Sequence, residues 1–342
     1  MSVSPCARCG WHAGARQAVT LVPIRLLVVP LCLLLSALLP SVVLASSDPS
    51  SPSVAARPPL DGSLHAAPCH YGRTQRVADI QMKSIPEASA LVASQQSPGV
   101  YWTVNDAHHM PRLHAFDQDG HARGSFTVAG AQDVDWEALQ LGPAPSGGWA
   151  LYVGDIGDND AKRHETMIYR LPEPRPLPAD ARPGGDQTVT AEAFRLTFPD
   201  GPHNAEAMLV HPKTGELVVI TKERGGISGV YRAPQLDARR AVTLEWIGRV
   251  DVRSGSPDRD LVTDASIAAD ARHVTVRTYS HAFEYDLADG ASLGSIWGQQ
   301  PRVTTLDDGP KGEGITYRAD GQALMTIGEG TSPVLFQTGE EC

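Results

Sequence analysis

No long stretch of this sequence carries apolar residues at the spacing of an amphipathic helix. Short strand-like runs separated by turn signals fill the chain instead, from Cys69 to its end. Runs of this kind predict β-strands, and their number over 274 residues is compatible with a barrel or propeller folded as one domain. The missing helical period therefore predicts an all-β protein.

Positive charge is also scarce. The chain has 29 basic against 39 acidic residues, which gives a formal charge of −10. A chain of this sign repels nucleic acid and anionic membranes, because both carry negative charge. We therefore expect no nucleic acid duplex among its partners.

Motifs of covalent and P-loop catalysis are missing as well. The sequence has no nucleophile elbow, no Ser-His-Asp order of a known triad and no P-loop. Their absence disfavours a mechanism through a covalent serine intermediate.

The first 45 residues predict a secretory signal peptide. An apolar run from Arg25 to Ala45 follows a region with only positive charges and ends in small residues. Cleavage after Ala45 removes three basic and no acidic residues, so the formal charge falls from −10 to −13. Residues 46–68 are rich in Ser, Pro and Ala, which predicts a disordered linker. We expect a secreted or periplasmic protein with no membrane span after cleavage.

A repeat organises the remaining chain. Five segments share one pattern of a small or acidic residue, a short apolar strand, a turn and a second strand, and they begin at Ser89, Glu137, Glu206, Ser266 and Glu313. The starts are 48, 69, 60 and 47 residues apart. A third strand follows in every unit and a fourth in the first four units, which is the pattern of propeller blades. We predict a single β-propeller of five four-stranded blades over residues 69–342, with six blades as the alternative.

The two ends of this domain are expected to close the ring. The fifth unit lacks a fourth strand, and the segment at 74–81 belongs to no other blade, so it can supply that strand. Once the signal region is removed, only Cys69 and Cys342 remain, and an oxidising compartment favours their pairing. We therefore predict a disulfide between them in a monomeric propeller.

The first residues of the five units suggest a metal site. The first strand of each propeller blade lines the central channel, so these side chains are expected to converge. Three converging carboxylates repel one another unless a cation is bound, and oxygen ligands in a roomy ring suit Ca²⁺. The predicted calcium ligands are Ser89, Glu137, Glu206, Ser266 and Glu313. A water-filled polar channel, with carboxylates protonated or paired with Lys311, is the alternative.

The loops that follow the second strands should surround the metal end of the channel. They carry polar and charged side chains that can bind a small anionic ligand or a component of the cell envelope together with the cation. The predicted ligand-binding residues are Asn105, Asp106, Arg112, Asp155, Asp158, Arg163, Lys222, Arg224 and Tyr279.

Several motifs carry a resemblance to known proteins. The segments WTVNDAHH, DWEALQLGP, LYVGDIGDND and GEGITYRADG resemble a family of secreted bacterial β-propellers over most of 87–332. More distantly, the chain is similar to the calcium-activated soluble apyrases, which are five-bladed propellers. In those enzymes Ser and Glu at the starts of inner strands hold calcium. The resemblance implies the same role for Ser89 in SALVA, Glu137 in EALQL, Glu206 in EAMLV, Ser266 in SIAAD and Glu313 in EGITY, with Asp264 as an alternative in the fourth unit.

Two functions are consistent with these patterns. The first is an exported calcium-binding propeller that binds a ligand at the channel face. The second is a calcium-dependent hydrolase of phosphoester, nucleotide or ester substrates. Propellers host both classes, so the fold alone does not choose between them.

Overall fold

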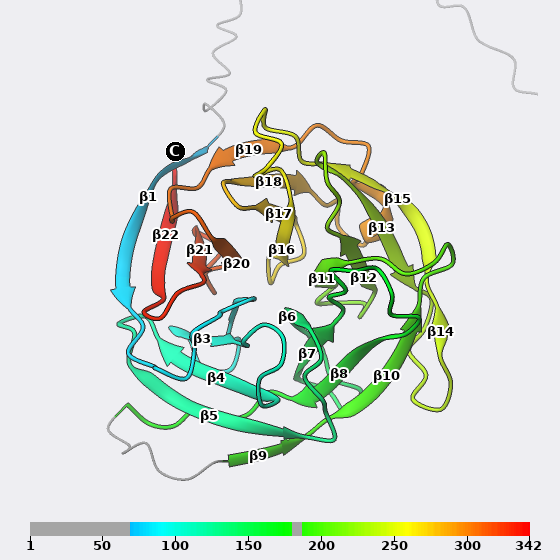
Figure 1. The fold of residues 1–342 in the computed structure, drawn as a ribbon. Coiled ribbons are helices and arrows are strands. Elements are labelled where there is room, and N and C mark those ends of the chain that lie inside the picture. Colours follow the sequence, from blue (N-terminus) through cyan, green and yellow to red (C-terminus); the bar gives the residue numbers. More distant parts are fainter. Residues whose placement is uncertain (1–68, 180–186) are drawn as a thin grey trace, which may run out of the picture. The chain divides into compact units, whose positions relative to one another are not determined.

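The computed structural model of the chain describes residues 69–179 and 187–342. These residues form a five-bladed β-propeller, as the repeat predicts. Figure 1 shows the five sheets arranged around a central axis, with the inner strands β6, β11, β16 and β20 nearest to it. The predicted signal peptide and linker, at 1–45 and 46–68, lie outside the described residues.

Each blade is one sheet. Blade 1 contains β2 (Val92–Ala93), β3 (Val100–Thr103), β4 (Arg112–Asp117), β5 (Ala122–Ala129) and β9 (Gln187–Thr190). Blade 2 contains β6 (Trp136–Pro143), β7 (Trp149–Asp155), β8 (Thr166–Pro172), β10 (Glu192–Thr197) and β14 (Val242–Thr243). Blade 3 contains β11 (Ala205–Val210), β12 (Leu217–Thr221), β13 (Ile227–Ala233) and β15 (Glu245–Asp251). Blade 4 contains β16 (Val262–Ile267), β17 (His273–Thr278), β18 (His281–Asp286) and β19 (Arg302–Thr305). Blade 5 contains β20 (Gly312–Tyr317), β21 (Ala323–Gly328), β22 (Val334–Glu341) and β1 (His70–Asp79).

The hydrophobic core lies between neighbouring blades. Buried apolar side chains form five clusters, each with members from two adjacent sheets. Every residue of β11 and β12 is buried, which explains why these inner strands read as continuous apolar runs. The outer strand β15 has only one buried residue, Val250. The apolar content of a strand therefore follows its distance from the axis.

Blades 1 and 2 each carry a fifth strand that the sequence does not predict. β9 pairs with β5 in parallel, and β14 pairs with β10 in parallel. β9 lies in the long second unit, for which a sixth blade was the alternative, and β14 lies in the third unit. Each is a short addition to the four strands predicted for its blade. Both additions are short strands at the outer edge of a sheet, where they cover open hydrogen-bonding groups.

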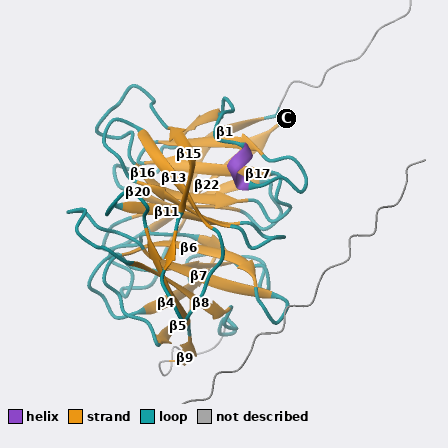
Figure 2. Cartoon of the chain, turned by 90° about the vertical axis from the view of Figure 1, so that its right-hand side faces the viewer, coloured by secondary structure: helices purple, strands orange, loops and turns teal. Residues whose placement is uncertain are grey.

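The N-terminal strand closes the ring as predicted. β1 pairs antiparallel with β22 and is the outermost strand of blade 5. Cys69 and Cys342 flank this pair and form a disulfide with an S–S distance of 2.08 Å. The single helical element of the described residues is the short turn η1 (Leu293–Ser295), purple in Figure 2. Within these residues, no helix has the length and apolar character needed to cross a membrane.

The closing disulfide should stabilise the propeller strongly. It joins residues 273 positions apart, and a loop of this length corresponds to about 5 kcal/mol in the chain-entropy model. Replacing both Cys69 and Cys342 with Ser should lower the midpoint of chemical unfolding without changing the far-UV spectrum of the folded protein. Equal midpoints for the two proteins, or two free thiols titrated in the unreduced protein, would contradict this prediction.

Candidate functional site

The inner strands share a β-bulge near their start. One extra residue interrupts the pairing with the second strand between Trp136 and Ala138, and likewise in blades 3, 4 and 5. Blade 1 has the same irregularity. Ala88 pairs with Asn105 and Val92 pairs with Trp102, so one extra residue of the first strand lies between these two pairs. A bulge redirects a side chain out of the regular alternation. The residues at this level, which we call the bulge ring, are Ser89, Glu137, Glu206, Thr263 and Glu313.

The register corrects one of the five predicted calcium ligands. In blade 4 the bulge lies between Val262 and Asp264, so Thr263 rather than Ser266 occupies the level of the ring. Ser266 lies three residues further along, beside Gln140 and Thr316 in a small cavity of about 30 Å³. The Thr263 hydroxyl donates to the carbonyls of Gly312 and Glu313, at 3.1 and 3.2 Å. The carboxylate of Asp264, the alternative ligand, accepts hydrogen bonds from the backbone N–H groups of Ala265 and Ile315.

Three carboxylates gather on one side of the bulge ring. Asp106, Asp135 and Glu137, which we call the acidic cluster, each offer an oxygen within 4.8 Å of the others. The Ser89 hydroxyl donates to Oε2 of Glu137 at 2.6 Å. Oδ1 of Asp135 is buried and has no hydrogen-bond partner among the described residues. A buried carboxylate oxygen without a partner is costly, so this atom is suited to a cation.

Burial raises the pKa of Glu137 and of Asp135 in the acidic cluster. The pKa of Glu137 lies well above its usual range because of burial and the negative charges of Glu206 and Asp106. Burial and the neighbouring Asp106 raise the pKa of Asp135 to about 7. Like charges held together in a buried site disfavour ionisation, and a bound cation reverses that effect.

Lys222 occupies the other side of the ring. Its ammonium group lies 3.0 Å from Oε1 of Glu206 and 5.2 Å from the ring centroid of Tyr279. Burial alone would lower the pKa of Lys222, but the charges of Glu206 and Glu313 raise it above the usual range. Lys222 therefore stays charged as the internal counter-ion of these two carboxylates. The sequence instead suggested Lys311 for this role, and Lys311 pairs with Glu329.

The loop after β7 supports the acidic cluster from outside. Arg163 bonds Asp155 Oδ1 at 2.8 Å and the carbonyl of Gly157 at 2.7 Å. Asp158 accepts the backbone N–H of Arg163, and its own N–H donates to Asn204. Three predicted ligand-binding residues, Asp155, Asp158 and Arg163, thus have their charged groups engaged within the loop.

The remaining predicted rim residues are spread over the same face. Asn105 is buried and donates to the carbonyl of Ser84 at 2.8 Å, so its amide serves the backbone. Arg112 begins β4. Arg224 is exposed in the segment between β12 and β13. Of the nine predicted ligand-binding residues, the structure brings Asp106, Lys222 and Tyr279 to the bulge ring.

Two contributors to the site were not predicted as such. Asn204 donates to Oε1 of Glu206 at 3.2 Å, and Gly157 packs against the acidic cluster. A Cβ on Gly157 would lie 2.4 Å from Cγ of Asp135 and 2.9 Å from Cγ of Glu137. The motif GDIGDND contains this glycine, but only the fold shows that its missing side chain makes room for two carboxylates.

Comparisons with known proteins give little further guidance. No protein-family model matches the chain, and no curated protein does. Among solved structures it is similar to XC5397 from Xanthomonas campestris, described as a gluconolactonase important in glucose secondary metabolic pathways. The two share 15% identity over 74% of this chain and 72% of that chain, with a TM-score of 0.40. This distance carries no argument about activity, so the site is interpreted from its own residues.

Substituting Gly157 with Ala should disturb the acidic cluster. The added methyl group must displace Asp135 and Glu137, and overpacking of this kind costs about 1–3 kcal/mol. Chemical unfolding should show the loss. Gly298→Ala is the matched control, because a Cβ there meets nothing within 4 Å and should change stability by less than about 0.5 kcal/mol. Equal stability of the two variants would show that the cluster tolerates the methyl group.

The raised pKa of Asp135 predicts a pH dependence of the metal-free protein. The folded state holds this proton up to about pH 7, whereas the unfolded chain releases it near the ordinary aspartate pKa of 3.8. The resulting stabilisation is complete below about pH 4 and is lost as the pH rises toward 7. In chelator, the melting temperature should fall over this range, and the fall should be smaller for Asp135→Asn. Identical profiles for the two proteins would contradict the assignment.

Proposed function

We propose that this protein is an exported calcium-binding β-propeller that binds a ligand at the channel face next to the cation. The unpartnered buried oxygen of Asp135, held within 4.8 Å of oxygens from Asp106 and Glu137, is the observation that carries the proposal. The donor set consists of oxygen atoms only, which suits a hard cation. In this proposal Asp106, Asp135 and Glu137 hold the ion, and Ser89 positions Glu137.

Charge balance supports a cation rather than an empty polar channel. Five carboxyl groups interact around the bulge ring, those of Asp106, Asp135, Glu137, Glu206 and Glu313, and Lys222 is the one cation that pairs with the ring glutamates among the described residues. Without a metal, several of them must keep a proton. A divalent cation with Lys222 supplies three positive charges, so all five can approach full ionisation.

The same balance restricts the ligand. Five negative against three positive charges leave an excess of negative charge even with calcium bound. A small anionic ligand or an anionic envelope component would therefore bind only through the cation itself, because the surrounding carboxylates repel it. Oxygen atoms of the ligand would complete the coordination of the ion. We therefore favour ligand binding over phosphoester hydrolysis as the function of this site.

Hydrolysis remains the second proposed function. A bound calcium ion would polarise a substrate oxygen and orient water beside it, with Asp106, Asp135 and Glu137 holding the ion. A screen of the purified protein against nucleotides, phosphoesters and acyl esters, with calcium and with chelator, separates the two functions. Turnover that requires calcium and is lost in Asp135→Asn would establish the hydrolase.

Calcium should stabilise the protein, and the gain should grow with the logarithm of the free calcium concentration above the dissociation constant. At a hundredfold excess over the dissociation constant the gain is about 2.7 kcal/mol. The melting temperature should rise with calcium and fall with chelator. Glu137→Gln removes a charge with almost no change in volume, so it should weaken calcium binding while the fold is retained.

Ser266→Ala is the matched control for this experiment. Ser266 lies at the other end of β16 from the bulge, so its loss should leave the calcium response unchanged. If melting is indifferent to chelator and calorimetry detects no calcium uptake by metal-stripped protein, the acidic cluster is not a calcium site.

A further inference from the structure

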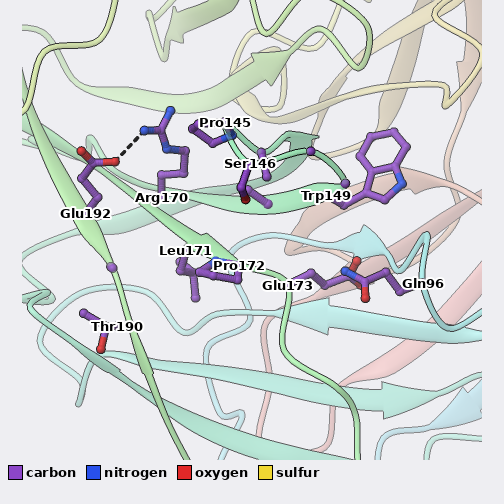
Figure 3. Close-up of a pocket in the computed structure, with 15 residues that line it drawn as sticks. Gln96, Pro145, Ser146, Trp149, Arg170, Leu171, Pro172, Glu173, Thr190 and Glu192 are labelled. Atoms are coloured by element: carbon purple, nitrogen blue, oxygen red, sulfur yellow. Dashed lines mark hydrogen bonds and ion pairs between the residues drawn. The ribbon is translucent and has the colours of Figure 1, made fainter.

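A second cavity lies between blades 1 and 2, at the end of β6 and β7 opposite to Glu137. It encloses about 700 Å³, within the range of small-molecule sites. Its wall includes the turn that joins β6 to β7, the end of β8 and the start of β10. Figure 3 shows Trp149, Pro145 and Pro172 around it, with Glu173 and Gln96 together at one end and the Arg170–Glu192 pair at the other.

The cavity wall is mainly apolar. Trp149 follows two glycines with positive φ, Gly147 and Gly148, which let the chain turn sharply before β7. Leu171 and Pro172 end β8 on the other side. An apolar wall of this size buries a hydrocarbon or aromatic body, which gives a ligand most of its binding free energy.

Glu173 is the exceptional residue of this cavity. It is a carboxylate only 6% exposed. Its Oε1 accepts hydrogen bonds from Ser94 at 2.5 Å and from Trp102 Nε1 at 3.0 Å. Its Oε2 is buried and makes no hydrogen bond of normal geometry with the described residues. The side chain and the backbone N–H of Gln96, an exposed residue of the turn between β2 and β3, also interact with this carboxylate.

The charges around the cavity are unequal. Arg170 is engaged at the far end, where it bonds Glu192 at 2.5 Å and lies 4.8 Å from the ring centroid of Phe194. These two charges cancel, so Glu173, whose pKa is raised by burial, is the carboxyl group of the lining that has no cationic partner among the described residues. A cationic donor that moves Gln96 aside would satisfy Oε2 and offset the desolvation of this carboxylate.

We propose that this cavity is a binding site for an apolar amine, with the hydrocarbon or aromatic body against Trp149 and Pro172 and the ammonium group at Glu173. The site is separate from the acidic cluster, since the two lie at opposite ends of β7. It does not depend on calcium. The protein would thus present two independent sites on its two faces.

The unmodified protein provides the first test, by calorimetric titration with three probes of similar size. Phenethylamine should bind saturably. Phenethyl alcohol has the same body without the charge and should bind about tenfold more weakly, and hydrocinnamate, with a carboxylate, should not bind. Equal binding of the amine and the alcohol, or no saturable binding of the amine, would overturn the proposal.

Two variants then locate the ammonium group. Glu173→Gln keeps an oxygen that can accept from Ser94 and Trp102, so the fold should persist while phenethylamine binding weakens about tenfold. Replacing Arg170 and Glu192 together with Gln removes both charges of the pair, so the net charge of the cavity is unchanged and the affinity should stay within about twofold. A loss confined to this double variant, or none in either variant, would refute the role of Glu173. Thermal melting of each variant shows whether its fold is intact.

Discussion

The mutual repulsion of the carboxyl groups at the bulge ring is the constraint on which the site depends. The propeller fold brings one inner strand from each blade to the axis, and the bulges turn Glu137, Glu206 and Glu313 inward. The fold offsets part of this repulsion itself. Lys222 neutralises the carboxylate of Glu206, while burial raises the pKa of Asp135 and so favours its protonated form. The repulsion is thus offset differently on the two sides of the ring, and on the side of Asp135 a buried carboxylate oxygen has no hydrogen-bond partner among the described residues.

The supporting residues show how this arrangement is maintained. Arg163 forms an ion pair with Asp155 at the loop after β7, and Asn204 donates a hydrogen bond to Glu206. These contacts hold the acidic residues in place. Gly157 contributes by having no side chain. Most charged side chains around the site are therefore paired with other side chains of the protein. Their arrangement favours binding of a cation over direct attraction of an anion from solvent.

Much of the fold follows from the sequence, because blades repeat. The recurrent pair of strands, the unpaired segment at 74–81 and the two terminal cysteines were enough to predict five blades and their closure. The fifth strands of blades 1 and 2 could not be predicted, because β9 and β14 are short and lie within long connections. Such strands form only because a sheet edge is nearby.

The site was predictable in its glutamates and less so elsewhere. Glu137, Glu206 and Glu313 stand at equivalent positions because an acidic residue marks the bulge in blades 2, 3 and 5. In blade 4 the bulge carries Thr263. Ser266, three residues later, matched the pattern of a small or acidic residue before an apolar strand more closely. The partners of Lys222 and the packing of Gly157 depend on contacts between blades, which a single sequence does not contain.

The pairing of β1 with β22 has a consequence for how the chain is made. β1, the first strand of the described residues, has its hydrogen-bonding partner in β22, the last of these strands. Until β22 arrives, β1 must wait as an open edge, while blades 2 to 4 can form from local hairpins. The pairing of β1 with β22 therefore joins the described strands that are farthest apart in the sequence, and it is expected to form late in folding.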